Sequence, residues 1–455
     1  MKDLTQGPIP RQVVAMAVPI FAGMVFQTLY FLVDLYFVAG LGDAALAGVG
    51  SAGNVTMVIF ALTQMLGVGT VALVSHAAGR KDQGQANLIF NQSVLLSAIL
   101  AVVTLVAGYG LTSAYVHSLA ADEAAAAAGI EYLHWYLPGL ALQFAMVAMG
   151  SALRGTGIVK PTMMVQVLTV VLNTVFAPIF IAGWGTHHAF GPAGAGFAST
   201  LAIAIGVVFL WSYFAKLEHF VALDRKLWAP HFATWKRILN IGLPAGGEML
   251  AIFVVVAVVY WAIRDFGPAT QAGFGIAQRV MQALFVPVMA ITFAAAPVAG
   301  QNFGAGHAER VKETFRAAAW MSTVLMLADT LLCLWQADAL IRLFSSDPAV
   351  IAVGDTYLRI ISWNFVATGV AFTCSSMFQA LGNSWPSLIS SGARVITYVI
   401  AAIWLGAHGH FELRHLWYVS VGTVTLQAAL SLLLLQQQFR QRLGPMARQQ
   451  TAATS

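Results

Sequence analysis

The 455 residues are 59% apolar and only 9% charged, and their formal net charge is +5. A soluble globular chain carries about 25% charged residues, so this composition excludes an ordinary soluble protein and indicates a chain solvated by a lipid bilayer. The two cysteines lie in apolar stretches and indicate neither a disulfide framework nor a metal site. The modest basic charge bears on membrane orientation and gives no reason to expect a nucleic-acid partner.

Twelve segments are long and apolar enough to cross a bilayer, which takes about 20 mostly apolar residues. They lie near 12–40, 46–76, 87–112, 129–152, 161–185, 193–214, 236–263, 270–300, 313–336, 352–380, 386–408 and 414–437. The first is interpreted as a retained helix, because no small-residue cleavage site accompanies it. The sequence therefore predicts an all-α membrane protein with twelve transmembrane helices.

Basic residues alternate between the loops in the way that sets membrane orientation, with Lys and Arg enriched on the cytoplasmic side. With the N-terminus inside, the outer loops hold only Arg264, Arg342 and Arg414 as clear basic residues. The inner loops and the tail contain Arg80, Lys81, Arg154, Lys160, Lys216, Arg225, Lys226, Lys236, Arg237, Arg310, Lys312, Arg316, Arg440, Arg442 and Arg448. This pattern predicts that both termini are cytoplasmic.

The chain repeats itself at an offset of 225 positions, which places residue 41 on residue 266. LGDAALAGVGSAGNV aligns there with FGPATQAGFGIAQRV, and the same offset pairs Pro19 with Pro244 and Tyr132 with Tyr357. One offset along the whole chain indicates a duplication. Each half holds six predicted helices, so both copies enter the membrane from the same side and the repeat is parallel.

The duplication predicts two pseudo-twofold-related six-helix bundles. Substrate is expected to bind in the cleft between them, with alternating access produced by their rocking. The predicted parts are an N-terminal bundle at 1–214, a polar basic cytoplasmic linker at 215–235, a C-terminal bundle at 236–437 and a cytoplasmic tail at 438–455.

Several motifs resemble those of the MATE family, multidrug and toxic compound extrusion. They are LVDLYFVAGLGDAALAGVG at 32–50, ALVSHAAGRKDQGQAN at 72–87, ALRGTGIVKP at 152–161, GPAGAGFAST at 191–200, APVAGQNFGAGHAERVKE at 296–313 and FQALGNSWP at 378–386. The resemblance covers essentially the whole chain and looks closest to the bacterial DinF-like branch, because of the aspartate in the first helix. It implies efflux of organic, often cationic amphiphiles driven by a proton or sodium gradient.

Asp34, in the outer half of the first predicted helix, is the leading candidate for the coupling residue. Its repeat partner is Val259, so the duplicated scaffold folds without an acid at this place. An ionisable group at membrane depth is costly and indicates function. In apolar surroundings a carboxyl group is easier to protonate, so it can exchange a proton for a cation. The family's first-helix aspartate matches this position.

The resemblance also implies companions for Asp34 on helices 5 and 6. Asn173 matches an amide position of the family's cation site, and Ala195 and Ser199 match positions in helix 6. The family often has an aspartate before the proline of the helix 5 motif, where this chain has Ala177. A sodium ion at Asp34 and Asn173 therefore has only one carboxylate, which favours proton coupling.

Three other ionisable residues are candidates at membrane depth, and their roles stay open. Glu248, whose repeat partner is Gly23, matches a carboxyl position in part of the family and is a candidate for binding substrate or cation. Asp329 fits a helix–helix hydrogen bond better than a function. Arg394 either pairs with an acid or lines the cleft.

Aromatic, amide and methionine side chains near Asp34 are candidates for binding drugs of different shapes, because soft and aromatic surfaces adapt to their ligands. The candidates are Tyr30, Tyr36, Phe37, Gln64, Met65, Tyr260 and Gln282.

Two other functions were weighed against drug efflux. A lipid-linked oligosaccharide flippase of the same superfamily is disfavoured, because such proteins often have extra helices and a cationic cavity. An enzyme is disfavoured because no ligand or nucleophile cluster lies at membrane depth; the adjacent or near-adjacent histidines His187, His188, His408 and His410 lie in predicted outer loops. We expect a monomer in the bacterial inner membrane that needs no cofactor besides its coupling ion.

Overall fold

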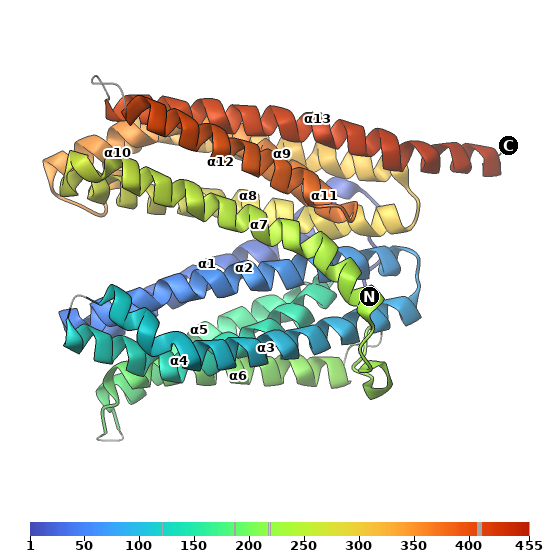
Figure 1. Cartoon of the computed structure of the whole chain (residues 1–455). Helices are drawn as coiled ribbons and strands as arrows, with labels where there is room; N and C mark the ends of the chain where they lie inside the picture. Colours follow the sequence, from blue (N-terminus) through green and yellow to red (C-terminus); the bar gives the residue numbers. More distant parts are fainter. Residues whose placement is uncertain (121, 186–187, 217, 219, 407–411, 455) are drawn as a thin grey trace. The chain divides into compact units, whose positions relative to one another are not determined.

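The computed structural model describes residues 1–120, 122–185, 188–216, 218, 220–406 and 412–454. All regular structure in these ranges is helical, as Figure 1 shows. The elements are α1 (Ile9–Ala39), α2 (Asp43–Gly79), α3 (Gln83–Leu119), α4 (Glu123–Gly155), α5 (Lys160–Ala182), α6 (Gly191–Lys216), η1 (Arg225–Leu227), α7 (Phe232–Ile263), η2 (Arg264–Phe266), α8 (Pro268–Gly304), α9 (Ala308–Arg342), α10 (Pro348–Ile361), η3 (Ser362–Asn364), α11 (Phe365–Ala380), α12 (Trp385–Gly406) and α13 (Leu413–Thr454).

Within the described part of the chain, 12 helical stretches are long and apolar enough to cross a membrane. The tenth is Pro348–Ala380, in which α10 and α11 are joined by η3. Every predicted segment overlaps one of these stretches, so the prediction of an all-α protein with twelve transmembrane helices is confirmed. The helices are also separated where the sequence has turn residues. Gly42 and its repeat partner Gly267 have φ of 102° and 89°, a conformation that favours glycine.

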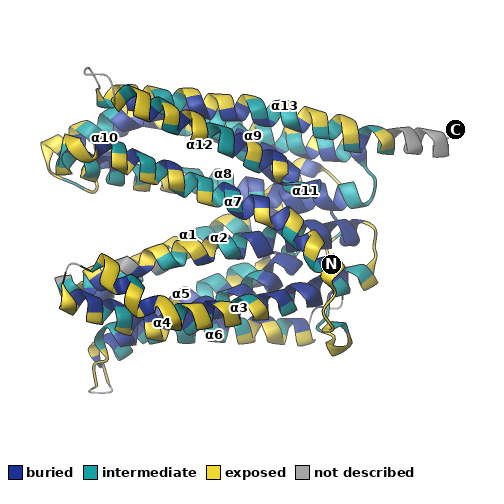
Figure 2. Cartoon of the chain, viewed as in Figure 1, coloured by how far each residue is buried: buried dark blue, intermediate teal, exposed yellow. Residues whose placement is uncertain are grey.

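Many large apolar side chains lie on the surface of the helices, as the exposed residues in Figure 2 illustrate. On α3, Val102, Val106 and Leu111 are all exposed, and Val106 is 71% exposed. Contiguous apolar surface of this kind is unfavourable in water and favourable in lipid. The chain is therefore a multi-pass membrane protein.

The first compact unit consists of Met1–Asp3 and Pro19–Gly242. In it α4 is central, because it packs against α2, α3 and α6, while α5 packs against α6. Leu140, Phe144 and Ala148 of α4 are fully buried in its apolar core.

The segment after α6 is bound to α3 within this first unit. Buried Asn91 accepts a hydrogen bond from the backbone of Asp224 at 2.9 Å and donates one to the carbonyl oxygen of Ala222 at 2.9 Å. Gln92 donates to the carbonyl oxygen of Leu227 at 2.6 Å. Because these side chains satisfy backbone groups that no regular structure satisfies, they fix the path of the segment.

The second compact unit consists of Leu4–Val18 and Leu243–Ser455. In it α8 packs against α9, α10 and α11, and α13 packs against α11 and α12. The start of the chain is fixed here: the side chain of Gln301 accepts from the backbone of Leu4 at 3.0 Å, and Arg310 donates to the carbonyl oxygen of Gly7 at 2.9 Å. The predicted boundaries at 1–214, 215–235, 236–437 and 438–455 followed the helix count, and they stay a prediction.

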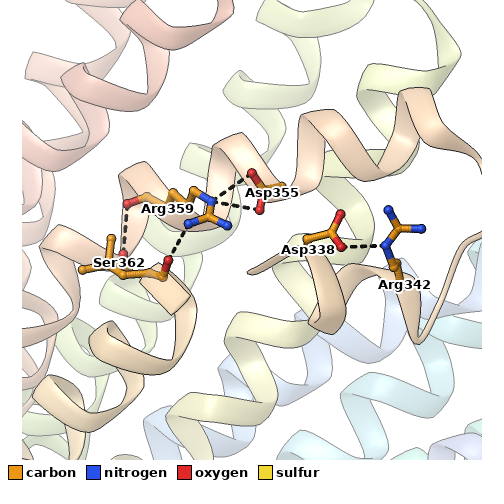
Figure 3. A network of polar contacts seen from close by, with 6 residues as sticks. Asp338, Arg342, Asp355, Arg359 and Ser362 are labelled. Carbon is orange, nitrogen blue, oxygen red and sulfur yellow. Dashed lines mark hydrogen bonds and ion pairs between the residues drawn. The ribbon is translucent and has the colours of Figure 1, made fainter. Parts of the chain in front are cut away.

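Ion pairs of the second unit are local and lie toward helix ends, as Figure 3 shows for α9 and α10. Arg342 donates to Asp338 at 2.6 Å, and Arg359 donates to Asp355 at 2.9 Å, each one helical turn away. The same arrangement ties η3 to α10, because Ser362 donates to the carbonyl oxygen of Arg359 at 3.0 Å. Because each of these arginines has an acidic partner on its own helix, its charge is balanced without a ligand.

The glycines shared by the two halves allow close contacts between helices. A Cβ atom on Gly48 of α2 would lie 2.5 Å from the carbonyl oxygen of Ala125 and 2.7 Å from the nitrogen of Gly129, both in α4. In the second unit, a Cβ atom on Gly273 of α8 would lie 2.8 Å from the carbonyl oxygen of Val350 in α10. The repeated glycines therefore preserve the same helix crossing in both units.

We expect Gly48→Ala to destabilise the first unit by about 1–3 kcal/mol, because the added methyl group overlaps the backbone of α4. The measurement is the thermal unfolding temperature of the purified protein in detergent. Gly50→Ala is the matched control, since a Cβ atom there meets nothing within 4 Å, and it should leave the unfolding temperature unchanged or raise it. Equal unfolding temperatures for Gly48→Ala and the wild type would contradict the close crossing.

Candidate functional site

Asp34 lies on α1 and is buried in the first unit, with 9% of its surface exposed. Ser199 of α6 donates to its Oδ1 in a long hydrogen bond of 3.5 Å. Asn173 of α5 and Tyr132 of α4 are its other polar neighbours. Four helices therefore contribute to one buried polar site, which consists of Asp34, Tyr132, Asn173 and Ser199.

Asn173 is fully buried beside Asp34. Neither the nitrogen nor the oxygen of its amide lies within hydrogen-bonding geometry of a described residue. Buried amides are almost always hydrogen-bonded. The amide can donate to a carboxylate or, through its oxygen, contribute to binding a cation. It is therefore suited to a site whose occupant changes.

No described residue forms an ion pair with Asp34. Its surroundings consist of a hydroxyl group, an amide and phenol rings, all of them neutral. An ionised carboxylate at such a place is costly unless a cation or a proton joins it. The site can therefore take up a proton or hold a cation, and its charge differs between these two states.

Ala195 and Ala177 are fully buried in α6 and α5. Neither side chain has a polar atom that could bind a cation. At these positions only a backbone carbonyl oxygen could be a ligand, and the small side chains leave space for one. Around Asp34 the described residues supply one carboxylate only, in agreement with the sequence.

The predicted drug-binding residues of the first unit lie in different environments. Tyr30, one turn before Asp34 on α1, is an electrostatic neighbour of that carboxylate. Tyr36, by contrast, is 75% exposed, because two residues along a helix turn the side chain by about 200°. Phe37 packs against the apolar core. Their role in binding drugs stays a prediction.

The remaining members of that set are divided between the units. Gln64 is half-buried on α2, and Met65 is buried where a Cβ atom on Gly242 of α7 would meet its carbonyl oxygen. In the second unit, Tyr260 of α7 lies edge-on to Phe274 at 5.0 Å between ring centroids, and Gln282 of α8 is exposed.

Glu248 occupies a second buried polar site, on α7 of the second unit. Its Oε2 accepts hydrogen bonds from Ser375 of α11, at 2.7 Å, and from Ser387 of α12. Ser391, one turn after Ser387, is a further neighbour. Unlike the amide beside Asp34, the two serine hydroxyls are hydrogen-bonded to the carboxylate and lie 2.9 Å from each other.

Asp329 and Arg394 are the two other charged residues that the sequence places at membrane depth. Asp329 is half-buried on α9, near Cys333. Arg394 of α12 lies 3.4 Å from Oε1 of Gln427 of α13 and forms no ion pair with a described residue. Of the two roles left open for Arg394, pairing with an acid is thus not present among the described residues.

The part of the chain that the structure describes contains no group of three or more His, Cys, Asp or Glu side chains that could hold a metal ion. His187, His408 and His410 lie outside the described residues, and His188 lies between α5 and α6.

Comparison with known proteins bears on both halves of the chain. The MatE family model matches residues 19–179 and again residues 244–404, an offset of 225 positions between the two starts. The chain belongs to the MatE family. Its members are transporters and not enzymes, so the predictions of family and of a non-enzyme are confirmed.

Relatives of this MATE protein are similar along most of their length. "Probable multidrug resistance protein YpnP" of Bacillus subtilis is 28% identical over 90% of this chain and 92% of its own. "FAD transporter" of Shewanella oneidensis is 24% identical over 90% of this chain and 91% of its own. A solved structure described as an outward-facing conformation of a multidrug resistance MATE family transporter superposes with a TM-score of 0.88, at 27% identity and 98% coverage of both chains.

Sequence reasoning missed several polar residues of this MATE transporter. Tyr132 beside Asp34 was visible only as a residue that both halves share, paired with Tyr357. Ser375 and Ser387 beside Glu248 carry no motif that separates them from serines bonding to their own helix backbone. A cue was available at Ser387 and Ser391, whose spacing of four places both on one face of a helix.

We expect Glu248→Leu to destabilise this MATE transporter by about 1–3 kcal/mol, because it leaves two buried hydroxyl groups without their acceptor. Glu248→Gln is the matched variant, since its side-chain oxygen can still accept from Ser375 and Ser387. Thermal unfolding of the purified proteins in detergent should give the order wild type, Gln variant, Leu variant. An unfolding temperature of the Leu variant equal to that of the wild type would contradict the contacts around Glu248.

Proposed function

We propose that this MATE transporter exports organic, mostly cationic amphiphiles in exchange for protons, with Asp34 as the coupling carboxylate. The observation that carries the proposal is a buried carboxylate in the first unit that only neutral groups surround. Such a carboxylate holds a cation or a proton, and the two compete for one negative charge.

The exchange follows from that competition. When Asp34 is ionised, its charge attracts a cationic substrate, and Ser199 and Asn173 orient the carboxylate oxygens. When a proton binds, the negative charge disappears and the cation is released. Proton entry is further favoured by a membrane potential, which contributes about 2.3 kcal/mol per charge per 100 mV. Alternating access of two bundles would then separate uptake from release.

Protons are favoured over sodium ions as the coupling ion because of the ligands around Asp34. A hard cation requires several oxygen ligands. Here Asp34 is the one carboxylate, Ser199 and Tyr132 supply hydroxyl groups, and Asn173 supplies an amide oxygen. Ala177 supplies no second acid, so a sodium ion at Asp34 and Asn173 would be poorly neutralised. A proton needs only the single carboxylate.

Drug efflux is supported by the relatives' names, two of the three described above being multidrug resistance proteins. The alternative is the lipid-linked oligosaccharide flippase of the same superfamily, which binds an anionic pyrophosphate. The acidic group in the first unit favours a cation over that ligand. The name of the FAD transporter makes flavin export a useful additional assay. Our proposal also includes a monomer in the bacterial inner membrane, with both termini cytoplasmic.

The test is uptake of ethidium by inside-out membrane vesicles, in which export is directed into the lumen. We expect an acidic lumen to drive uptake by the wild type and a sodium gradient alone not to do so. Asp34→Asn should reduce uptake to background, because the variant keeps the shape of the side chain and loses its charge. Expression is checked by immunoblotting of the vesicles.

Asp329→Asn is the matched control, since it removes another intramembrane carboxylate in the second unit and should keep wild-type uptake. Full uptake by Asp34→Asn would overturn the assignment of Asp34, and uptake driven only by sodium would overturn the preference for protons.

A further inference from the structure

The duplication places a counterpart of the Asp34 site in the second unit, and its chemistry differs. At the 225-residue offset that the family match also shows, Tyr132 corresponds to Tyr357 and Asn173 to Tyr398. Asp34 corresponds to Val259, so the carboxylate is missing from this copy. Arg394 corresponds to Thr169, which lies one turn before Asn173 on α5. The second copy has thus lost an acid and gained a base.

These second-unit groups lie together. Arg394 and Tyr398 are one turn apart on α12 and therefore share a face of that helix. Each is an electrostatic neighbour of the other and of Tyr357 on α10. The ring of Tyr357 lies edge-on to that of Trp417 of α13, at 4.7 Å between centroids, and Trp417 stacks on Phe274. The cluster of Tyr357, Arg394, Tyr398 and Trp417 is called the Arg394 cluster below.

Three hydrogen-bonding groups of the Arg394 cluster lack a partner among the described residues. They are the Nε of Arg394, the hydroxyl of Tyr398 and the Nε1 of Trp417. Tyr398 is 0% exposed and Trp417 is 1% exposed, so water does not satisfy them at the surface. Native proteins leave few buried polar groups unpaired, because a group that has lost its hydrogen bonds to water destabilises the fold unless a partner replaces them.

The polarity of the missing partner follows from these groups. A guanidinium and an indole nitrogen only donate hydrogen bonds, and a phenol hydroxyl can donate as well. Arginine stays charged in proteins. Among the described residues no carboxylate pairs with Arg394, which donates a hydrogen bond to the amide oxygen of Gln427 at 3.4 Å. The buried acid of the same unit, Glu248, accepts hydrogen bonds from Ser375 and Ser387.

We infer that the Arg394 cluster is a binding site for a small monovalent anion, a halide or a carboxylate group. Such a ligand accepts hydrogen bonds from all three donors and neutralises the guanidinium. The inference goes beyond export of cations through Asp34, because it concerns the other unit and the opposite charge. One duplicated scaffold thereby holds a site for a positive occupant in its first copy and a site for a negative occupant in its second.

Thermal unfolding of the purified full-length protein in detergent tests the inference. Sodium is held constant while gluconate, a bulkier anion, is replaced stepwise by chloride in one arm and by acetate in another. We expect a saturable rise in unfolding temperature in at least one arm. A response to chloride alone identifies a halide site, and a response to acetate alone identifies a carboxylate site.

Variants link this rise to the cluster. Arg394→Gln should abolish it, and Tyr398→Phe, which keeps the ring and removes one donor, should move its midpoint to a higher anion concentration. The Tyr398 variant carries the test if Arg394→Gln does not fold. Arg279→Gln is the control, because Arg279 is an exposed arginine on α8 of the same unit, and it should respond like the wild type.

An unfolding temperature that is equal in gluconate, chloride and acetate would overturn the inference. So would a saturable rise that Arg394→Gln and Tyr398→Phe both keep unchanged. Ethidium export through Asp34 does not enter this readout, so failure of the anion site and failure of the proposed function are separable.

Discussion

A charge inside a bilayer is stable only when something nearby compensates it, and this constraint organises the functional chemistry of the protein. At exposed positions near helix ends, Arg342 and Arg359 each pair with an aspartate one turn away. Asp34 does not, since its neighbours are a serine, an amide and phenol rings. Under the proposed function the compensation comes from a mobile species, and a proton or a cationic substrate each provides it. Exchange between the two is the property that an antiporter needs.

The two units share a duplicated helical scaffold, but the polar residues buried in them differ. The two units keep the glycines at the same helix crossings, Gly48 in one and Gly273 in the other, because close approach of backbones tolerates no side chain. Polar groups were free to diverge. Gly23 of the first unit leaves room for the side chain of Gln166, whereas the corresponding positions of the second unit carry Glu248 and Ser391. The longer polar side chain thus comes from α5 in the first unit, as Gln166, and from α7 in the second, as Glu248.

The sequence was sufficient for the fold, because length and hydropathy define spanning helices and one repeat offset defines their grouping. It also brought Asp34, Asn173 and Ser199 together, through motifs and not through geometry. It did not identify Tyr132 as part of the site. A tyrosine that both halves share is interpreted as structural until the structure shows that it lies beside Asp34. Closeness in sequence does not give closeness in space at Tyr36, because helical periodicity turns this side chain away from Asp34 to an exposed position. The serines around Glu248 depend on contacts between helices, which no single-helix pattern encodes.

Proton release on substrate binding tests most directly the claim that Asp34 exchanges a proton for a cation. The purified protein is mixed with ethidium in a weakly buffered solution, and the pH change is recorded together with the amount bound. The account predicts release of up to about one proton per cation bound, at a pH where Asp34 is protonated in the free protein, and no release from Asp34→Asn. Binding by the wild type without proton release at any pH, or equal release from the variant, would contradict it.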